Sequence, residues 1–458
     1  GANLVNPDKI CNFAGRKFRS MTMEKFIRIL RIGIPIMLGQ ACIIIMAFAD
    51  NIMIGWHSVP ELAASGFVNN MMNLFILIEL GFAMGMTPVI GAQYGTGDRA
   101  GIGLTLRNGV RINARLGTLA TLIVLGIYPF LGHFGQDPEL LPRISTVPVL
   151  GFNLLKQFTD GVQAPVVSML FLLGGNLLNI AGNWILIYGK LGCPELGLTG
   201  AGISTLISRI IMLAGFALYI FRSRRFIGYS DAYRKARPEK EGMRNLFDMG
   251  YPLALQMGME TSSFTFSAVM VGWLGATALA AHQVAITISQ LFFMMMQGLA
   301  FSVSILVSEE FGKKNYRGVR GYVRTGYLMM LGISVILSAL LYIFRWEAAG
   351  IFTDSQEVSA MAVSVFFVLF SYQFGDGLQL CFANALRGIC DVKPIMAAAF
   401  ISYYLIGIPV SWLLGFKAGL GITGIWIGFP AGLTCAGIFF WRRFRHSLAA
   451  YEKNGNEQ

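Results

Sequence analysis

Four carboxylate side chains lie well inside apolar segments of this 458-residue chain: Asp50, Glu79, Glu260 and Asp376. A charge near the centre of a bilayer costs about 2.5–3.5 kcal/mol on insertion scales, so an ionisable residue there is read as functional by default. Each group must face a hydrated cavity, take up a proton or bind a cation. Burial favours the protonated acid and oxygen donors suit a small cation, so the sequence leaves both chemistries open.

Polar neighbours distinguish three of these carboxylates. Asp50, Glu260 and Asp376 stand close to asparagine, hydroxyl or tyrosine side chains, whereas Glu79 has no polar neighbour. Tyr372 precedes Asp376 by one helical turn, so both side chains face the same way. We expect these three acids to line a polar cavity. For Glu79, a structural hydrogen bond between helices is an equally good interpretation.

Two further polar positions share a helix face. Asn179 and Asn183 are four residues apart, and their amide oxygens could join a carboxylate in binding a small cation. Taken alone, such asparagines more often connect helices. We expect His282 to be a packing residue rather than a proton relay. We likewise expect the methionines 294–296 to pack against lipid or core rather than to form an adaptable binding wall.

The composition indicates a membrane protein. Hydrophobic residues make up 55% of the chain and charged residues 13%, roughly half the charged fraction of a soluble protein. The net charge is +12, but the basic residues lie between apolar segments, which is typical of loops that orient membrane helices and argues against nucleic-acid binding. The six cysteines have no metal-ligand spacing and are expected to be apolar fillers.

Twelve apolar segments are long enough to cross a bilayer. They cover residues 29–54, 63–90, 110–131, 140–157, 164–188, 200–221, 247–273, 279–308, 323–344, 356–381, 393–415 and 421–441. Basic residues gather in the N-terminal segment, the central linker, the C-terminal tail and alternate loops, so both termini are expected in the cytoplasm. No signal peptide is visible, and residues 1–20 are given no function because MTMEKF at Met21 reads as a natural start.

The two halves of the chain repeat one another. A shift of 217 residues matches glycine, proline, tryptophan and arginine positions in one register, including Gly33 with Gly250, Gly81 with Gly298, Gly95 with Gly312, and Arg107 with Arg324. Parallel halves of this kind pack about an axis along the membrane normal with the substrate path between them. The predicted fold is therefore an all-α membrane protein of twelve helices in two pseudo-symmetric six-helix lobes around a central cavity. The fourth segment departs from the repeat because it is short and contains Pro148.

This repeat defines the expected domains. They are a cytoplasmic N-terminal segment (1–28), an N-lobe (29–221), a cytoplasmic linker (222–246), a C-lobe (247–441) and a cytoplasmic tail (442–458).

The order and spacing of several stretches resemble the MATE (multidrug and toxic compound extrusion) antiporters, especially the NorM-like branch. The stretches include GIPIMLGQ, FADNIMIGW, AQYGTGD, NLLNIAGNWILIYGKLGCPELGLTGAGIST, GYPLALQMGMETSSF, LGATALAAHQVA and YQFGDGLQLCFANALRGICDVKPI. The resemblance implies exchange of Na⁺ or H⁺ for amphiphilic organic cations. It implies that Asp50 is the N-lobe carboxylate, with Asn179 and Asn183 grouped near it. It also implies that Glu260 and Asp376, with Tyr372 beside them, form the C-lobe cation site, and Na⁺ is the metal ion expected there. It assigns no role to Glu79.

The expected function is multidrug efflux by alternating access, in which Asp50, Glu260 and Asp376 bind substrate or coupling cation. We expect a monomer in a bacterial inner membrane, surrounded by lipid and needing no cofactor. The alternative is a lipid-linked saccharide flippase of the same broad superfamily. It would favour a basic cavity, whereas the carboxylates noted above are acidic. An enzyme is disfavoured because neither HExxH nor GxSxG occurs, and a channel because no filter-like segment occurs.

Overall fold

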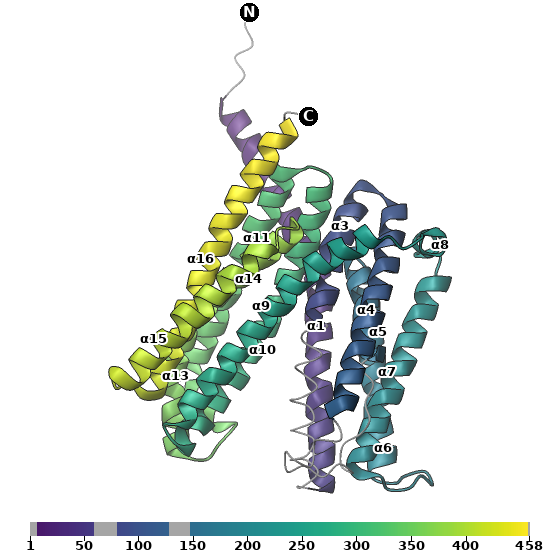
Figure 1. Ribbon diagram of the computed structural model, residues 1–458. Helices are drawn as coiled ribbons and strands as arrows, with labels where there is room; N and C mark the ends of the chain where they lie inside the picture. The colour runs from purple at the N-terminus through teal and green to yellow at the C-terminus, as the bar shows by residue number, and fades with distance from the viewer. Residues whose placement is uncertain (1–6, 59–79, 128–146, 457–458) are drawn as a thin grey trace, which may run out of the picture.

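The computed structural model describes residues 7–58, 80–127 and 147–456, which are almost entirely helical and contain no strand (Figure 1). Helices of the first half are α1 (Pro7–His57), α3 (Met86–Thr96), α4 (Arg99–Ile127), α5 (Val147–Gly161), α6 (Pro165–Ile187) and α7 (Gly197–Arg222). Then follow α8 (Ile227–Lys235), α9 (Lys240–Gly272), α10 (Ala276–Gly312), α11 (Tyr316–Ile343), α12 (Arg345–Gly350) and α13 (Gln356–Gly388). The chain ends with α14 (Lys393–Phe400), η3 (Ile401–Gly407), α15 (Ile408–Trp412), η4 (Leu413–Lys417) and α16 (Gly421–Asn456).

The expected all-α membrane fold is confirmed. Eight helices in the described ranges are long and apolar enough to cross a membrane. The other four predicted spans are the second, third, fourth and seventh. Their described parts are residues 80–84 with α3 for the second, α4 for the third, α5 for the fourth and α9 for the seventh. The described residues of the twelve predicted spans are thus mainly helical, and the second span has a turn at Gly85.

The region expected as the linker, residues 222–246, contains α8 and the first turns of α9. The described part of the fourth span continues as α5 to Gly161, beyond the predicted end at residue 157.

The eleventh span contains two π-helical segments, η3 and η4, that the sequence did not predict. Such widened turns recur at functional sites.

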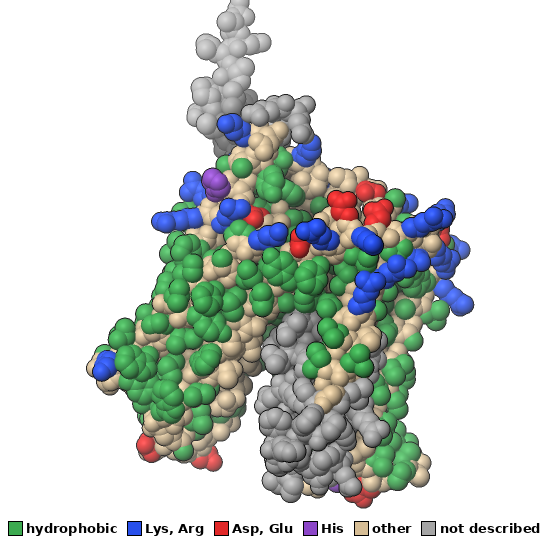
Figure 2. Space-filling model, in the orientation of Figure 1, with side chains coloured by type: hydrophobic (Ala, Val, Ile, Leu, Met, Phe, Trp, Pro, Cys, Tyr) green, Lys and Arg blue, Asp and Glu red, His purple; other side chains and the backbone are tan. Residues whose placement is uncertain are grey.

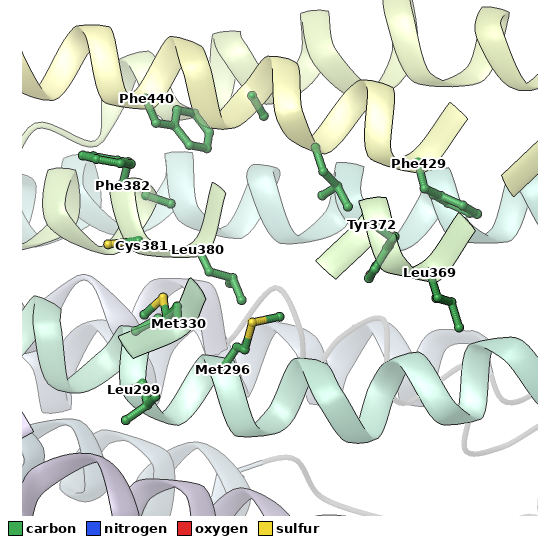
Figure 3. Close-up of a cluster of buried hydrophobic side chains, with 14 of the residues drawn as sticks. Met296, Leu299, Met330, Leu369, Tyr372, Leu380, Cys381, Phe382, Phe429 and Phe440 are labelled. Atoms are coloured by element: carbon green, nitrogen blue, oxygen red, sulfur yellow. The ribbon is translucent and has the colours of Figure 1, made fainter. Parts of the chain in front are cut away.

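The helices form two groups that diverge from a shared end (Figure 1). In one group α6 packs against α1 and α7; in the other α13 packs against α10 and α16. Figure 2 shows lysine and arginine side chains gathered at the shared end, and apolar side chains over the flanks. Figure 3 shows the core of the second group, where Met296 of α10, Met330 of α11 and Phe440 of α16 meet side chains of α13.

The groups meet through glycines that the repeat had matched. A Cβ added at Gly95 of α3 would lie 2.2 Å from the carbonyl oxygen of Glu309, and one at Gly312 of α10 would lie 2.1 Å from that of Ala92. Shifting either contact by 217 residues yields the other, so the two contacts are related by pseudo-symmetry. Gly33 and Gly250 form a second symmetric pair, in which an added Cβ would first meet side-chain atoms, Cδ2 of Leu299 at 3.0 Å and Cδ1 of Phe82 at 2.7 Å. At Gly95 and Gly312 the backbones themselves approach so closely that they leave no room for a side chain.

We predict that Gly95→Ala destabilises the protein by about 1–3 kcal/mol, because the new methyl group would overlap backbone that cannot swing away. The matched control is Gly332→Ala in α11, where a Cβ would meet no atom within 4 Å and the helix would gain from alanine. Thermal unfolding of the purified variants in detergent measures both. Equal midpoints for the two variants would contradict the close contact.

Candidate functional site

The first site surrounds Asp50 of α1. The Asn183 side-chain amide donates to the Asp50 carboxylate at 2.5 Å, and Asn179 accepts from the same Asn183 nitrogen at 3.5 Å. The Asn179 amide in turn donates to the Thr205 hydroxyl of α7 at 3.1 Å. Both asparagines are fully buried because they face α1 and α7 from one side of α6. The structure thus brings Asp50, Asn179 and Asn183 together.

Arg209 of α7 belongs to this site and was missed from the sequence. It is half-buried, its guanidinium donates to the Met46 sulfur at 3.4 Å, and it attracts the Asp50 carboxylate. Met46 and Asp50 are one helical turn apart on α1. A lone arginine in the middle of the predicted span 200–221 was a visible signal. The spans therefore contain a basic residue as well as acidic ones. The argument against a flippase, which relied on the spans carrying only acidic charges, is weakened accordingly.

The second site lies in the other helix group around Asp376 of α13. Its side chain is 1% exposed, and neither carboxylate oxygen has a hydrogen-bond partner among the described residues. The amide of Gln373, one turn earlier, is likewise unpartnered there. Glu260 of α9 is close enough for the two acids to repel one another, and Tyr372 interacts electrostatically with both. The structure therefore brings the three predicted residues of this group together.

A second buried arginine compensates part of this charge and was also missed. Arg387 of α13 is 8% exposed and attracts the Glu260 carboxylate. Its guanidinium donates to Gln256 at 2.9 Å and to Asn384 at 3.5 Å. Arg387 lies beyond the predicted end of the tenth span at residue 381, but α13 continues to Gly388.

A small cavity adjoins Glu260 between α9, α16 and the eleventh span. Its lining includes Ser263 and Ser267 of α9 and Tyr403 of η3. The volume of the cavity that the centre of a water molecule can occupy is about 10 Å³, which is roughly enough for one water. Tyr403 also accepts from the Gln379 amide at 3.0 Å, so the π-helical turn connects the cavity to α13. The cavity suits water or a small ion rather than a drug.

Aromatic side chains close the second site on one side. The rings of Trp426 and Phe429 of α16 lie 6.4 Å from that of Tyr372, and Figure 3 shows Tyr372 and Phe429 between α13 and α16. His282 is 1% exposed and accepts a hydrogen bond at Nδ1 from the Trp426 indole at 3.0 Å. This agrees with its predicted packing role. Met296 is fully buried in the core, as the packing interpretation also predicted.

The two sites belong to different helix groups. No hydrogen bond or ion pair among the described residues joins the Asp50 site to the Glu260–Asp376 site. Glu79 lies outside the described residues. In the described ranges no group of three or more histidine, cysteine, aspartate or glutamate side chains is placed to hold a metal ion. A sodium ion at the second site would therefore draw on the free oxygens of Asp376, the amide of Gln373 and water, a hard-oxygen set that fits the ion.

A polar cluster, also missed from the sequence, joins the two groups at their shared end. This end cluster consists of Arg28, Gln163, Glu309, Lys313 and Tyr322. The Glu309 carboxylate accepts from Arg28 at 2.7 Å, from Gln163 at 2.5 Å and from Lys313, while Arg28 also donates to Tyr322 at 2.8 Å. Burial alone would lower the pKa of Lys313, but the bond and attraction to Glu309 outweigh it and raise that pKa.

The comparisons with known proteins agree on one family. Residues 35–185 and 252–413 match the profile of the MatE family. The multidrug resistance protein NorM of Vibrio cholerae is 31% identical over 430 residues, which cover 91% of this chain and 94% of that protein. A probable multidrug resistance protein NorM of Xanthomonas campestris is 30% identical over 425 residues, covering 91% and 93%.

Solved structures share the fold. The outward-facing conformation of a multidrug resistance MATE family transporter superposes with a TM-score of 0.83 at 19% identity, covering 94% of this chain and 97% of that one. A MOP superfamily transporter from Pyrococcus furiosus superposes with a TM-score of 0.82 at 20% identity, covering 93% and 97%.

We predict that Arg28 and Glu309 together stabilise the contact between the two helix groups at their shared end. In a double-mutant cycle of Arg28→Gln and Glu309→Gln, the free energies of unfolding should be non-additive by roughly 1 kcal/mol, because the Glu309 carboxylate is only 8% exposed. The control cycle uses Arg320 and Glu452, a more exposed pair for which roughly 0.5 kcal/mol or less is expected. Additive effects at Arg28 and Glu309 would show that the end cluster contributes no joint stability.

Proposed function

We propose, since the chain belongs to the MatE family, that it exports amphiphilic organic cations in exchange for Na⁺ or H⁺ by alternating access. In general terms the protein is a membrane-embedded multidrug efflux transporter, because the relatives that match 91% of this chain are multidrug resistance proteins. The family consists of transporters rather than enzymes.

The observation that carries the proposal is the state of Asp376. A carboxylate that is 1% exposed, has no hydrogen-bond partner in the described chain and faces a second carboxylate is costly unless a cation or a proton joins it. The acid pair Glu260 and Asp376 therefore prefers a positively charged ligand. In our mechanism the coupling ion and the cationic drug compete for this preference, and their competition couples the two movements.

We propose that Asp50 is a second acidic group that takes part in the transport cycle. Its carboxylate, held by Asn183, belongs to the other helix group, so a cationic substrate between the groups could be attracted by acids on both sides. Residues 29–221 and 247–441 are proposed as the lobes that rock against one another, with 222–246 as the linker and 1–28 and 442–458 as the terminal segments. The close glycine contacts support a pivot between them.

The arrangement of charge supports an orientation. Lysine and arginine side chains gather at the shared end, which we place in the cytoplasm by the positive-inside rule together with both termini (Figure 2). The groups diverge toward the other side (Figure 1), so the structure would represent an outward-open state. We propose that the protein acts as a monomer in a bacterial inner membrane.

We predict that Asp376→Asn lowers coupled export of ethidium roughly ten- to a hundred-fold, because the amide no longer attracts the coupling cation. The measurement is ethidium efflux from cells or proteoliposomes under separate sodium and proton gradients. Glu260→Gln should act in the same direction. The matched control is Asp248→Asn, which makes the same chemical change at an exposed ion pair with Lys393 and should leave export unchanged.

Membrane abundance of each variant is measured in parallel by immunoblot. Normal export by an abundant Asp376→Asn variant would exclude the acid pair as the coupling site. Failure of the wild-type protein to move ethidium under either gradient would contradict the proposed function itself.

A further inference from the structure

We propose that Arg111 and Arg115 of α4 form a site for an anionic phospholipid, in which the two guanidinium groups hold the headgroup phosphate and the acyl chains lie along the same face of the helix. The inference goes beyond the proposed function because it concerns how the protein contacts the bilayer. It holds for any substrate or coupling ion, and its test requires no transport.

Both arginines are exposed, and their spacing of four residues places them on one face of α4. In the described part of the chain neither guanidinium has a hydrogen-bond or ion-pair partner. Arg107, one turn earlier, differs because it donates to the Tyr233 carbonyl at 3.0 Å and packs over that ring. Two like charges one helical turn apart repel one another. The described chain therefore leaves this pair of charges to be balanced by a group from outside.

Both arginines lie inside the third predicted span, which covers residues 110–131. A helix rises about 1.5 Å per residue, so the backbone of Arg115 lies roughly 7 Å inside the predicted boundary of that span. An uncompensated charge is costly at this depth, but a long arginine side chain extends back to the headgroup level. The negative groups available at that level are lipid phosphates. Position and charge together indicate a lipid headgroup as the partner.

The same helix face continues with exposed apolar side chains. Leu119 and Leu122 follow Arg115 by four and seven residues, and they are 55% and 60% exposed. The face thus passes from two positive charges near the predicted boundary to leucines deeper in the span. An anionic phospholipid has its groups in the same order, with the phosphate at the interface and the acyl chains below it. A free phosphate ion matches only the charged half of this pattern, so the site is assigned to a lipid.

The repeat provides an internal comparison. Helices α4 and α11 begin 217 positions apart, so α11 is the counterpart of α4 in the second group. Arg111 and Arg115 correspond to Leu328, which is 54% exposed, and to Gly332, where an added Cβ would meet no atom within 4 Å. The fold therefore does not require a charge at either position. This supports a specific binding role for the two arginines of α4.

The elements around the site add positive charge. Helix α8 packs along α4, and Figure 2 shows lysine and arginine side chains gathered in the region of α8. Exposed basic residues outnumber exposed acids in α8, in the turn before it and at the start of α4: Arg99, Arg224, Arg225, Arg234 and Lys235 against Asp98 and Asp231. Their combined field attracts an anionic headgroup to this part of the membrane surface.

The chemistry of the pair predicts which lipid it prefers. The planar fork of arginine donates two parallel hydrogen bonds to a phosphate, whereas lysine offers only a point charge. A phosphatidylglycerol headgroup carries one net negative charge. Phosphatidylethanolamine carries an ammonium group beside its phosphate, and two neighbouring guanidinium groups repel this ammonium. The site should therefore prefer phosphatidylglycerol.

The test is native mass spectrometry of the purified full-length protein in detergent, mixed with equal amounts of phosphatidylglycerol and phosphatidylethanolamine that have identical acyl chains. Wild type should retain phosphatidylglycerol over phosphatidylethanolamine by roughly ten- to thirty-fold, because two arginines contribute. Arg111→Gln with Arg115→Gln should retain the two lipids equally. Arg111→Lys with Arg115→Lys keeps both charges and should keep part of the preference.

The matched control is Arg317→Gln with Arg442→Gln. It also removes two exposed positive charges, but in the other helix group and outside the predicted spans, and it should keep the wild-type preference. The glutamine changes on α4 take charge out of a span, so they should not hinder membrane insertion. A further arm adds inorganic phosphate in large excess. It should not displace phosphatidylglycerol, because it has no acyl chains to contact Leu119 and Leu122.

Equal retention of the two lipids by wild type, an unchanged preference in the glutamine variant of α4, or the same loss in the control variant would each overturn the inference. Displacement by inorganic phosphate would show that the site binds a free anion, which overturns the assignment to a lipid. None of these results depends on ethidium export. A wild-type protein that exports no ethidium contradicts the proposed function and leaves the lipid site unaffected.

Discussion

The structure depends on one physical constraint, which is that a charge inside an apolar helix bundle must be balanced by another charge or by a bound ion. Asp50 satisfies it with Asn183 and Arg209, and Glu260 satisfies it in part with Arg387. Asp376 does not satisfy it within the described chain. In the proposed mechanism the unbalanced carboxylate is costly when empty, and this cost would favour the binding of a cation and its competition with a cationic drug.

The second requirement is that the two helix groups touch closely yet remain separable. Glycine contacts related by the 217-residue shift let backbones of α3 and α10 meet without interlocking side chains. The end cluster around Glu309 then joins the groups through hydrogen bonds and ion pairs, which water can replace when the contact opens. Smooth backbone contact together with replaceable polar bonds is compatible with rocking about the shared end, whereas a continuous apolar interface would resist it.

The sequence predicted the helices, the repeat and the site acids because each leaves a local signal. Apolar length marks a span, and the matched glycines of the repeat form symmetric contacts such as Gly95 with Glu309. A carboxylate such as Asp376 stands out in an apolar segment.

Arg387 was missed because the apolar stretch ends at residue 381 while α13 continues among buried polar residues to Gly388. Arg209 could have been found as a lone charge in mid-span. The end cluster and the π-helical turn at Tyr403 depend on which helix ends meet and on local backbone register, and neither leaves a pattern in one sequence.

The most direct test of the central claim is reciprocal binding of coupling ion and drug to the purified protein. The account predicts that saturating Na⁺ or H⁺ weakens ethidium binding, and that ethidium weakens binding of the same ion by the same factor, as linkage requires. In Asp376→Asn this mutual effect should disappear. Ethidium affinity that does not change with either ion in the wild-type protein would contradict the claim that the acid pair couples the two.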